Sequence, residues 1–267
     1  KEGKYEESIA QYKKALEIDP SFFASRMGIS NNLIYLNRYD EAIKNGNDSY
    51  EMAKNDGERR FALFTNTVAY VDAGNTEAAL KEMQKQYDLA KNINDAGAMS
   101  GDVNTMANIL FEAGKYDEAK AKFIESTSIL EKSDLSEAVK ENNRRLDDFD
   151  MGRISLMTGK IDEAKKHAQS FSISTEKANN KFQIWLSHYL NGLIALNEKN
   201  YKQAISEFEK SNLQNPQVLY YMAKAYSMDG NTSEAKKFAE RCVNFNPLIS
   251  LNEAFVRNKA KEMLKSI

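Results

Sequence analysis

The chain has 267 residues, of which 37 are basic and 39 acidic, with two histidines and one cysteine. A net charge of −2 argues against a nucleic-acid-binding protein, because such a protein needs a basic surface that displaces the counterions of the phosphates. The single cysteine, Cys242, excludes an internal disulfide, and its place in a small packing position predicts a buried structural thiol. No segment reaches the roughly 18 apolar residues that a membrane-spanning helix requires.

Seven copies of one short motif follow one another along the chain. Each has a turn residue, then a polar first helical turn, then a small residue five positions after the turn. The turn residues are Gly3, Asn37, Gly74, Gly114, Gly159, Lys199 and Gly230, so the copies start between 31 and 45 residues apart. The small residues are Ser8, Ala42, Ala79, Ala119, Ala164, Ala204 and Ala235. A recurrence with this period is typical of stacked helix pairs.

Each copy predicts a turn between two antiparallel helices. Glycine suits the left-handed residue at the end of the first helix, and acidic pairs such as Asp40 and Glu41 suit the first turn of the second. The small residue lets the two helices approach closely. Pro20, Pro216 and Pro247 each lie 17 residues after a turn residue, where the second helix has to end. We therefore expect seven second helices, six first helices and one helix after the last repeat.

The final segment, from Leu248 to Ile267, has apolar residues at roughly helical spacing. They are Leu251, Phe255, Ala260, Met263 and Leu264, and the positions between them include Arg257 and several lysines. One apolar and one charged face predict a helix that caps the last repeat. The alternative is a detachable tail that occupies a groove of the array. Pro247 precedes the segment so closely that little slack remains, which favours the cap.

The copy from Pro216 to Pro247 resembles a tetratricopeptide repeat most closely. Its family positions hold Leu219, Met222, Ala223, Tyr226, Gly230, Ala235, Ala239, Cys242 and Pro247. The resemblance covers residues 1–247, and the length variation among the repeats is similar to that of bacterial multi-repeat members. It implies an all-α, right-handed α-solenoid of about seven tetratricopeptide-like helix pairs at 1–247, with a C-terminal capping helix at 248–267. The repeats of 40 and 45 residues depart from the family's usual length.

The first copy starts at its turn, so the helix that would precede Gly3 is not part of the sequence. An uncovered face of Tyr5, Ile9, Tyr12 and Leu16 is therefore expected. Two functions follow as alternatives. The chain is the docking or regulatory portion of a larger bacterial protein whose catalytic domain lies upstream, or it is a self-associating module, a homo-oligomer formed through the N-terminal repeat.

No motif for catalysis or for a cofactor stands out. The sequence has no Gly-rich phosphate loop, CxxC, HExxH or GxSxG, which favours a protein that is not an enzyme and uses no cofactor. His167 lies in a charged run, so we expect it on a solvated helix face, whereas His188 begins a first helix and is expected to be packed. The two are too far apart, and too far from Cys242, to predict a zinc site.

Asp147, Asp148 and Asp150 form the densest cluster of carboxylates. Oxygens of this kind can hold a metal ion. However, Arg144 precedes Asp148 by four residues and Arg153 follows Asp150 by three, and these are same-face spacings on a helix. Ion pairs on the helix surface are therefore the favoured interpretation, and no metal site is predicted.

In the family that the repeats resemble, ligands lie along the concave surface that the first helices form. Counting back 13, ten, six and three residues from the turns gives that surface here. From these positions we select a peptide-binding groove of Asn31, Phe64, Val68, Asn108, Phe111, Phe149, Arg153, Tyr189, Tyr220 and Lys224. The competing interpretation is that the first helices bury much of this face against one another.

The chemistry of these groove residues suggests a ligand. Asn31 and Asn108 suit a peptide backbone, and Arg153 and Lys224 suit a carboxylate. The family's clamp for acidic tails is missing, because residues such as Met27 occupy its positions. A partner with apolar side chains, such as a helix laid in the groove, fits better. The sequence thus predicts a non-enzymatic protein–protein interaction scaffold that binds a peptide or a partner domain on its concave face.

Overall fold

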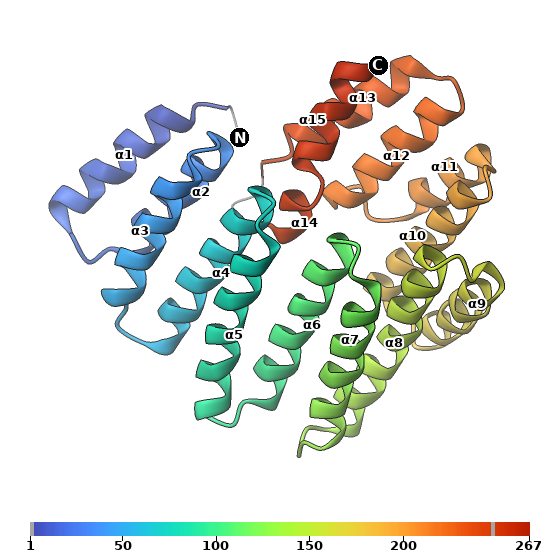
Figure 1. Ribbon diagram of the computed structural model, residues 1–267, viewed down its shortest axis with the longest axis horizontal. Helices are drawn as coiled ribbons and strands as arrows, with labels where there is room; N and C mark the ends of the chain where they lie inside the picture. The colour runs from blue at the N-terminus through green and yellow to red at the C-terminus, as the bar shows by residue number, and fades with distance from the viewer. Residues whose placement is uncertain (1–2, 247–248) are drawn as a thin grey trace.

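In the computed structural model, residues 3–246 and 249–267 are described, and they form fifteen helices and no strand (Figure 1). Thirteen helices make up the repeats: α1 (Tyr5–Ile18), α2 (Phe23–Tyr35), α3 (Tyr39–Glu51), α4 (Asp56–Asp72), α5 (Thr76–Asn92), α6 (Ala96–Glu112), α7 (Tyr116–Glu131), α8 (Glu137–Met157), α9 (Ile161–Lys177), α10 (Lys181–Asn197), α11 (Tyr201–Lys210), α12 (Pro216–Met228) and α13 (Thr232–Val243). Two more follow, α14 (Leu251–Ala254) and α15 (Arg257–Ser266). The chain is an α-solenoid, as the sequence predicts.

The helices follow one another along an arc, and the C-terminal segment lies between the two ends of that arc (Figure 1). From α2 onward, each even-numbered helix packs against the odd-numbered helix that follows it. Even-numbered helices also contact one another, as α2 does α4 and as α8 does α10, and α14 packs on α4 and α12. The even-numbered helices therefore form the surface toward which the tail is turned, which we call the inner surface.

The seven turn residues named from the sequence all have a positive φ in the structure. Asn37 and Lys199 take φ of 59° and 63° without being glycine, although this region is unfavourable for a residue with a Cβ. After each of the six inner turns, the next amide donates to a carbonyl five residues back, as Arg38 N does to Leu33 O at 2.9 Å. This bond satisfies a carbonyl that the helix end would leave free, and it reverses the chain in two residues.

The small residue of each repeat lies where two helices touch. Ala79, Ala119, Ala164, Ala204 and Ala235 are fully buried, and Ala42 is 1% exposed. Small residues recur on the facing helices, and at Gly192 a Cβ would lie 2.4 Å from Phe208 Cε1. At such a crossing the small residue makes room for a larger side chain of the facing helix, as Gly192 does for Phe208.

At the N-terminal end, α2 covers part of the face of α1 that was expected to be open. Ile9 is 5% exposed and belongs to a cluster of apolar side chains with Leu33 of α2, while Tyr12 and Leu16 pack against the same cluster. Tyr5 stacks on Tyr35 with ring centroids 5.1 Å apart. Tyr5, Tyr12 and Leu16 stay partly exposed, and Tyr12 lines a pocket with Phe22 and Phe61, so self-association through the N-terminal repeat stays a prediction.

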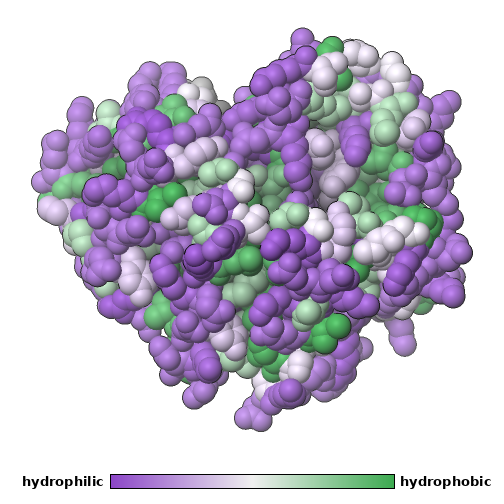
Figure 2. Space-filling view, viewed as in Figure 1, coloured by the Kyte–Doolittle hydropathy of each residue, from purple (hydrophilic) through white to green (hydrophobic). Residues whose placement is uncertain are grey.

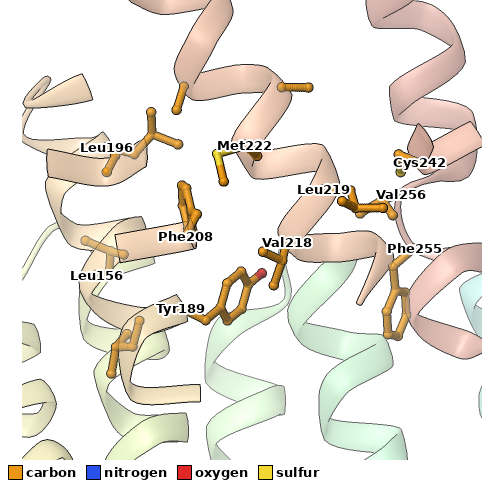
Figure 3. Close-up of a cluster of buried hydrophobic side chains, with 14 of the residues drawn as sticks. Leu156, Tyr189, Leu196, Phe208, Val218, Leu219, Met222, Cys242, Phe255 and Val256 are labelled. Carbon is orange, nitrogen blue, oxygen red and sulfur yellow. The ribbon is translucent and has the colours of Figure 1, made fainter. Parts of the chain in front are cut away.

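At the C-terminal end, the expected single capping helix is two helices. The helical path breaks at Val256, whose φ is −125°, and α15 then packs along α13 as a cap does. Phe255 and Val256 lie beside Leu219 and Cys242 in the largest apolar core of the molecule (Figure 3). The boundary placed from the sequence at Pro247 and Leu248 lies outside the described residues.

Candidate functional site

The C-terminal segment reaches the opposite end of the array through a buried arginine. Arg257 is 3% exposed. Its Nη2 and Nη1 donate to the last carbonyls of α2, Ile34 O at 3.0 Å and Tyr35 O at 3.1 Å, and its Nε donates to Asp72 Oδ1 at 3.1 Å. Asp72 is the last residue of α4 and also forms a direct ion pair with Nη2. The sequence assignment of Arg257 to an exposed, charged face was wrong.

Three further contacts join the same segment to the inner surface. Tyr35 Oη donates to Glu253 Oε2 at 2.8 Å, Asn258 Nδ2 donates to Asp72 O at 2.8 Å, and Lys259 Nζ pairs with Glu112 Oε2 at 2.8 Å. Burial raises the pKa of Glu253 to about 7, against the opposing effects of the Tyr35 hydrogen bond and of Arg257. The segment from Ser250 to Ser266, which we call the tail, therefore caps the last repeat and also holds the first repeats. The expectation that it has too little slack to reach them was wrong.

The tail closes the N-terminal part of the predicted groove. Asn31 and Val68 lie against Glu253, Ala254 and Arg257, and they are 8% and 4% exposed. Phe64 is half-buried and packs against two apolar clusters, and Tyr220 is half-buried at the other side of the tail. These four predicted groove residues are thus covered by, or packed beside, the chain's own C-terminal segment.

The C-terminal part of the inner surface keeps an open pocket of about 320 Å³ between α6, α8, α10 and α12. Its apolar wall consists of Phe111, Leu156, Tyr189, Leu193, Leu196 and Tyr221. Leu156, Tyr189 and Leu196 continue from this wall into the core (Figure 3). In the space-filling view, apolar surface gathers over the later repeats, whereas the rim of the molecule is mostly hydrophilic (Figure 2). The pocket brings together four predicted groove residues: Phe111, Arg153, Tyr189 and Lys224.

Arg153 forms the polar part of the pocket wall. It is 6% exposed, and its guanidinium lies 4.7 Å from the ring centroid of Phe111 and 4.6 Å from that of Phe149. Its Nη2 donates to Asn108 Oδ1 at 2.8 Å and to Asp150 Oδ1 at 2.6 Å, while its buried Nε has no hydrogen-bond partner. A buried donor without a partner costs about 1–3 kcal/mol. Phe149 and Asn108 therefore hold Arg153 in place rather than line the pocket themselves.

Positive charge exceeds negative charge around the pocket. Lys199 and Lys224 line it, and their ammonium groups have no hydrogen bond or ion pair to any described residue, whereas Glu112 accepts from both Gln217 Nε2 and Lys259 Nζ. Asp150 is paired with Arg153, although burial raises the pKa of its carboxyl against that pairing. Burial also raises the pKa of Tyr189 and of Tyr221 well above the ordinary range, so both hydroxyls remain protonated donors.

Four of the pocket residues that the sequence analysis missed have a recurring place. Glu112, Met157, Asn197 and Met228 all line the pocket, and each lies two residues before a turn residue. The count from the turns used 13, ten, six and three residues and so passed over this position. The signal was available, because it follows the same repeat period.

The other chemical candidates do not converge on one site. Asp147 accepts from Thr127, Asp148 from Ser170 beside His167, and Asp150 from Arg153, so the three carboxylates point to different partners. The Arg153–Asp150 pair was predicted at the helix surface but is buried, and Arg144 pairs with Glu131 and Glu137 instead of Asp148. Within residues 3–246 and 249–267, no three His, Cys, Asp or Glu side chains gather as metal ligands do.

The remaining candidates have structural settings. His188 Nδ1 lies 2.8 Å from Glu207 Oε2 on the neighbouring helix. Cys242 is fully buried, its Sγ donates to Pro216 O at 3.4 Å, and burial raises its pKa to about 12. None of the helices in the described part of the chain has both the length and the apolarity to cross a bilayer.

A second, more apolar pocket of about 650 Å³ lies at the N-terminal end, between the starts of α2 and α4. Phe22 and Phe61 are exposed there, at 49% and 44%, and Ile249 closes one side. Met27 of the inner surface lines it, but none of its lining side chains is a cation. Its lining includes one acidic residue, Glu58, and the predicted groove residue Asn31, and otherwise offers mainly apolar contact area.

Family and fold comparisons agree with these repeats. A TPR repeat model matches residues 1–26, and a tetratricopeptide repeat model matches residues 217–248. No curated protein matches the chain. The fold is an α-solenoid of helix pairs, and its first and last repeats are similar to tetratricopeptide repeats.

Solved structures share the fold at low sequence identity. A tetratricopeptide repeat protein from Parabacteroides merdae ATCC 43184 is 15% identical with a TM-score of 0.57, over 96% of this chain and 90% of that one. The apo form of RapI is 14% identical with a TM-score of 0.58, over 99% and 94%. A Rap protein complexed with competence and sporulation factor is 16% identical with a TM-score of 0.60, over 95% and 70%. At such low sequence identities, the similarity shows that the fold is shared and nothing further.

Proposed function

We propose that the protein is a non-enzymatic interaction scaffold that binds a polypeptide segment of a partner in the pocket between α6, α8, α10 and α12. One observation carries this proposal: the pocket is open on the inner surface and is lined by side chains from four consecutive repeats. Tetratricopeptide arrays generally serve as scaffolds for other proteins, and one structure of similar fold is a Rap protein complexed with a factor.

The occupied half of the inner surface narrows the choice of partner. Because the tail covers α2 and α4, a long helix would not find the whole groove free. A pocket of about 320 Å³ suits one or two anchoring side chains of a short segment. We therefore favour a short or extended peptide over the groove-length helix that the sequence analysis preferred.

The test is a selection of displayed random peptides followed by methyl NMR of the intact chain. Met157 and Met228 line the pocket and are 48% and 49% exposed, and Met52 is equally accessible at 46% but belongs to the end of α3. A selected peptide is expected to shift the methyl signals of Met157 and Met228 and to leave Met52 unchanged. Shifts at Met52 with no change at the pocket would place binding elsewhere and refute the proposal.

A further inference from the structure

Arg153 has hydrogen-bonding capacity that the chain itself does not use. Both of its hydrogen bonds come from Nη2, and Nε has no partner in spite of burial. Three aromatic rings surround the guanidinium, with Phe123 at 5.5 Å in addition to Phe111 and Phe149. These rings pack the guanidinium in place, and Arg153 is one of the residues that line the pocket.

The charges that line the pocket around Arg153 favour a ligand with a negatively charged group. Glu112 is the only acidic side chain of the pocket wall, and its two oxygens are taken by Gln217 and Lys259. The ammonium groups of Lys199 and Lys224 have no described partner, so they add two uncompensated positive charges at the mouth. Low-dielectric walls strengthen the attraction of such a group for an anion relative to open solvent.

The apolar lining of the pocket also favours a ligand that has an apolar group next to its negative charge. Tyr189 and Tyr221 present protonated hydroxyls, while Leu193, Leu196 and Met228 supply aliphatic surface within one pocket. A planar carboxylate matches the fork of a guanidinium, and a neighbouring aliphatic or aromatic side chain matches the remaining wall. A bare inorganic anion would leave that wall unfilled.

We propose that this pocket binds a carboxylate carried by an apolar residue, with Arg153 and Lys224 as its charged partners, and that the free C-terminus of a polypeptide is the source. The inference rests on the proposed function, because it names the part of a partner that enters the pocket. A C-terminal apolar residue presents carboxylate and side chain on one carbon, which a volume of about 320 Å³ accommodates without a through-going chain.

The test uses small probes, so that it does not depend on a partner's sequence. N-acetyl-phenylalanine, its amide, the dipeptide N-acetyl-Glu-Phe-amide and inorganic phosphate are each titrated into the intact chain at millimolar concentration. Methyl NMR at Met157 and Met228 reports binding, with Met52 as the reference. We expect the free acid to bind and its amide to bind about tenfold or more weakly, as the loss of a charge-assisted hydrogen bond implies.

Two charge-reversal variants distinguish binding in the pocket from attraction by the overall charge of the protein. Lys224→Glu lies in the pocket, and Lys236→Glu makes the same change at an exposed, unpaired lysine of α13. Both positions are exposed, so neither variant threatens folding. We expect Lys224→Glu to weaken the free acid about fivefold or more and Lys236→Glu to leave it within about twofold, because surface charges beyond a Debye length are screened.

Each other outcome has a definite meaning. Equal binding of acid and amide at the pocket would overturn the carboxylate site and leave the proposed function intact. Phosphate binding as tight as the free acid would reduce the site to a general anion site and overturn the proposal. Equal binding of the dipeptide would overturn the C-terminal source and move the carboxylate to a side chain. No shift with any probe would overturn the inference, while the displayed-peptide selection would still decide the proposed function.

Discussion

Arg257→Met tests whether the tail holds the first repeats through one buried ion pair. The substitution keeps most of the aliphatic volume and removes the charge that Asp72 and the carbonyls of Ile34 and Tyr35 share. Asp72, at 4% exposed, is then left in the interior with Tyr39 as its remaining side-chain partner in a hydrogen bond of 2.8 Å. Breaking a buried pair from one side costs about 3–5 kcal/mol, because the other charge stays buried without compensation.

The expected loss of stability can be measured as a lower Tm and as faster hydrogen exchange. For a chain of this length about 2 °C of Tm corresponds to each kcal/mol, so Tm should fall by roughly 6–10 °C. Hydrogen exchange should locate the loss in α14 and α15, since these helices detach before the repeats unfold. The double variant Asp72→Ala/Arg257→Met no longer buries a lone charge, so it should lose less than the two single variants together by at least about 1 kcal/mol.

Lys259→Met is the matched control. Lys259 belongs to the same tail and also pairs with an acid on the inner surface, but its side chain is 44% exposed. An exposed pair of this kind contributes about 0–1 kcal/mol. A loss below about 1 kcal/mol for Arg257→Met, with unchanged exchange in α14 and α15, would refute the assignment of Arg257 as the main attachment of the tail.

Three further changes test packing and titration. Ala119→Leu should cost about 1–3 kcal/mol in chemical denaturation by overpacking its helix pair, and a cost below about 0.5 kcal/mol would contradict the crossing described above. Gly192→Ala should destabilise because its Cβ would meet Phe208 at 2.4 Å, whereas Gly101→Ala, with open space around it, should stabilise by up to about 1 kcal/mol. Glu253 has a pKa raised from 4.5 to about 7, so the folded chain binds the extra proton and stability should fall as pH rises through that window. Glu253→Gln should flatten this pH dependence of unfolding, and an unchanged slope would count against the raised pKa.

The features that the sequence predicts well depend on residues within one repeat. A turn residue such as Gly114 and a contact residue such as Ala119 are five positions apart, so one helix pair determines both. Their period then repeats along the chain, and each copy supports the interpretation of the others. The positive φ at Lys199, which has no glycine, was predictable for this reason alone.

The path of the tail is different in kind, because it depends on contacts across 185 residues and more. The curvature of the array is the sum of small rotations between neighbouring repeats, and repeats of 31 to 45 residues do not rotate equally. Helical periodicity identifies the faces of a helix, but it does not say which face meets a distant element. Arg257 was therefore assigned to solvent as a charged residue, although it is the one that binds Asp72.

The predicted groove also depends on contacts with a distant element, which helical periodicity does not reveal. All ten residues were selected by one counting rule, which treats every repeat as equally open. The tail then covers Asn31 and Val68, whereas Phe111, Arg153, Tyr189 and Lys224 remain at the pocket. The rule identified the inner surface, and only the long-range closure decides which part of it stays accessible.

Glu112 connects the tail to the pocket. Its Oε1 accepts from Gln217 of α12, its Oε2 pairs with Lys259 of α15, and its side chain forms part of the pocket wall on α6. These contacts join helices more than a hundred residues apart in the sequence. They also neutralise the one acid of that wall, which leaves the charge of Lys199 and Lys224 uncompensated. The tail therefore contributes to the net positive charge of the pocket wall, although none of its described residues lines it.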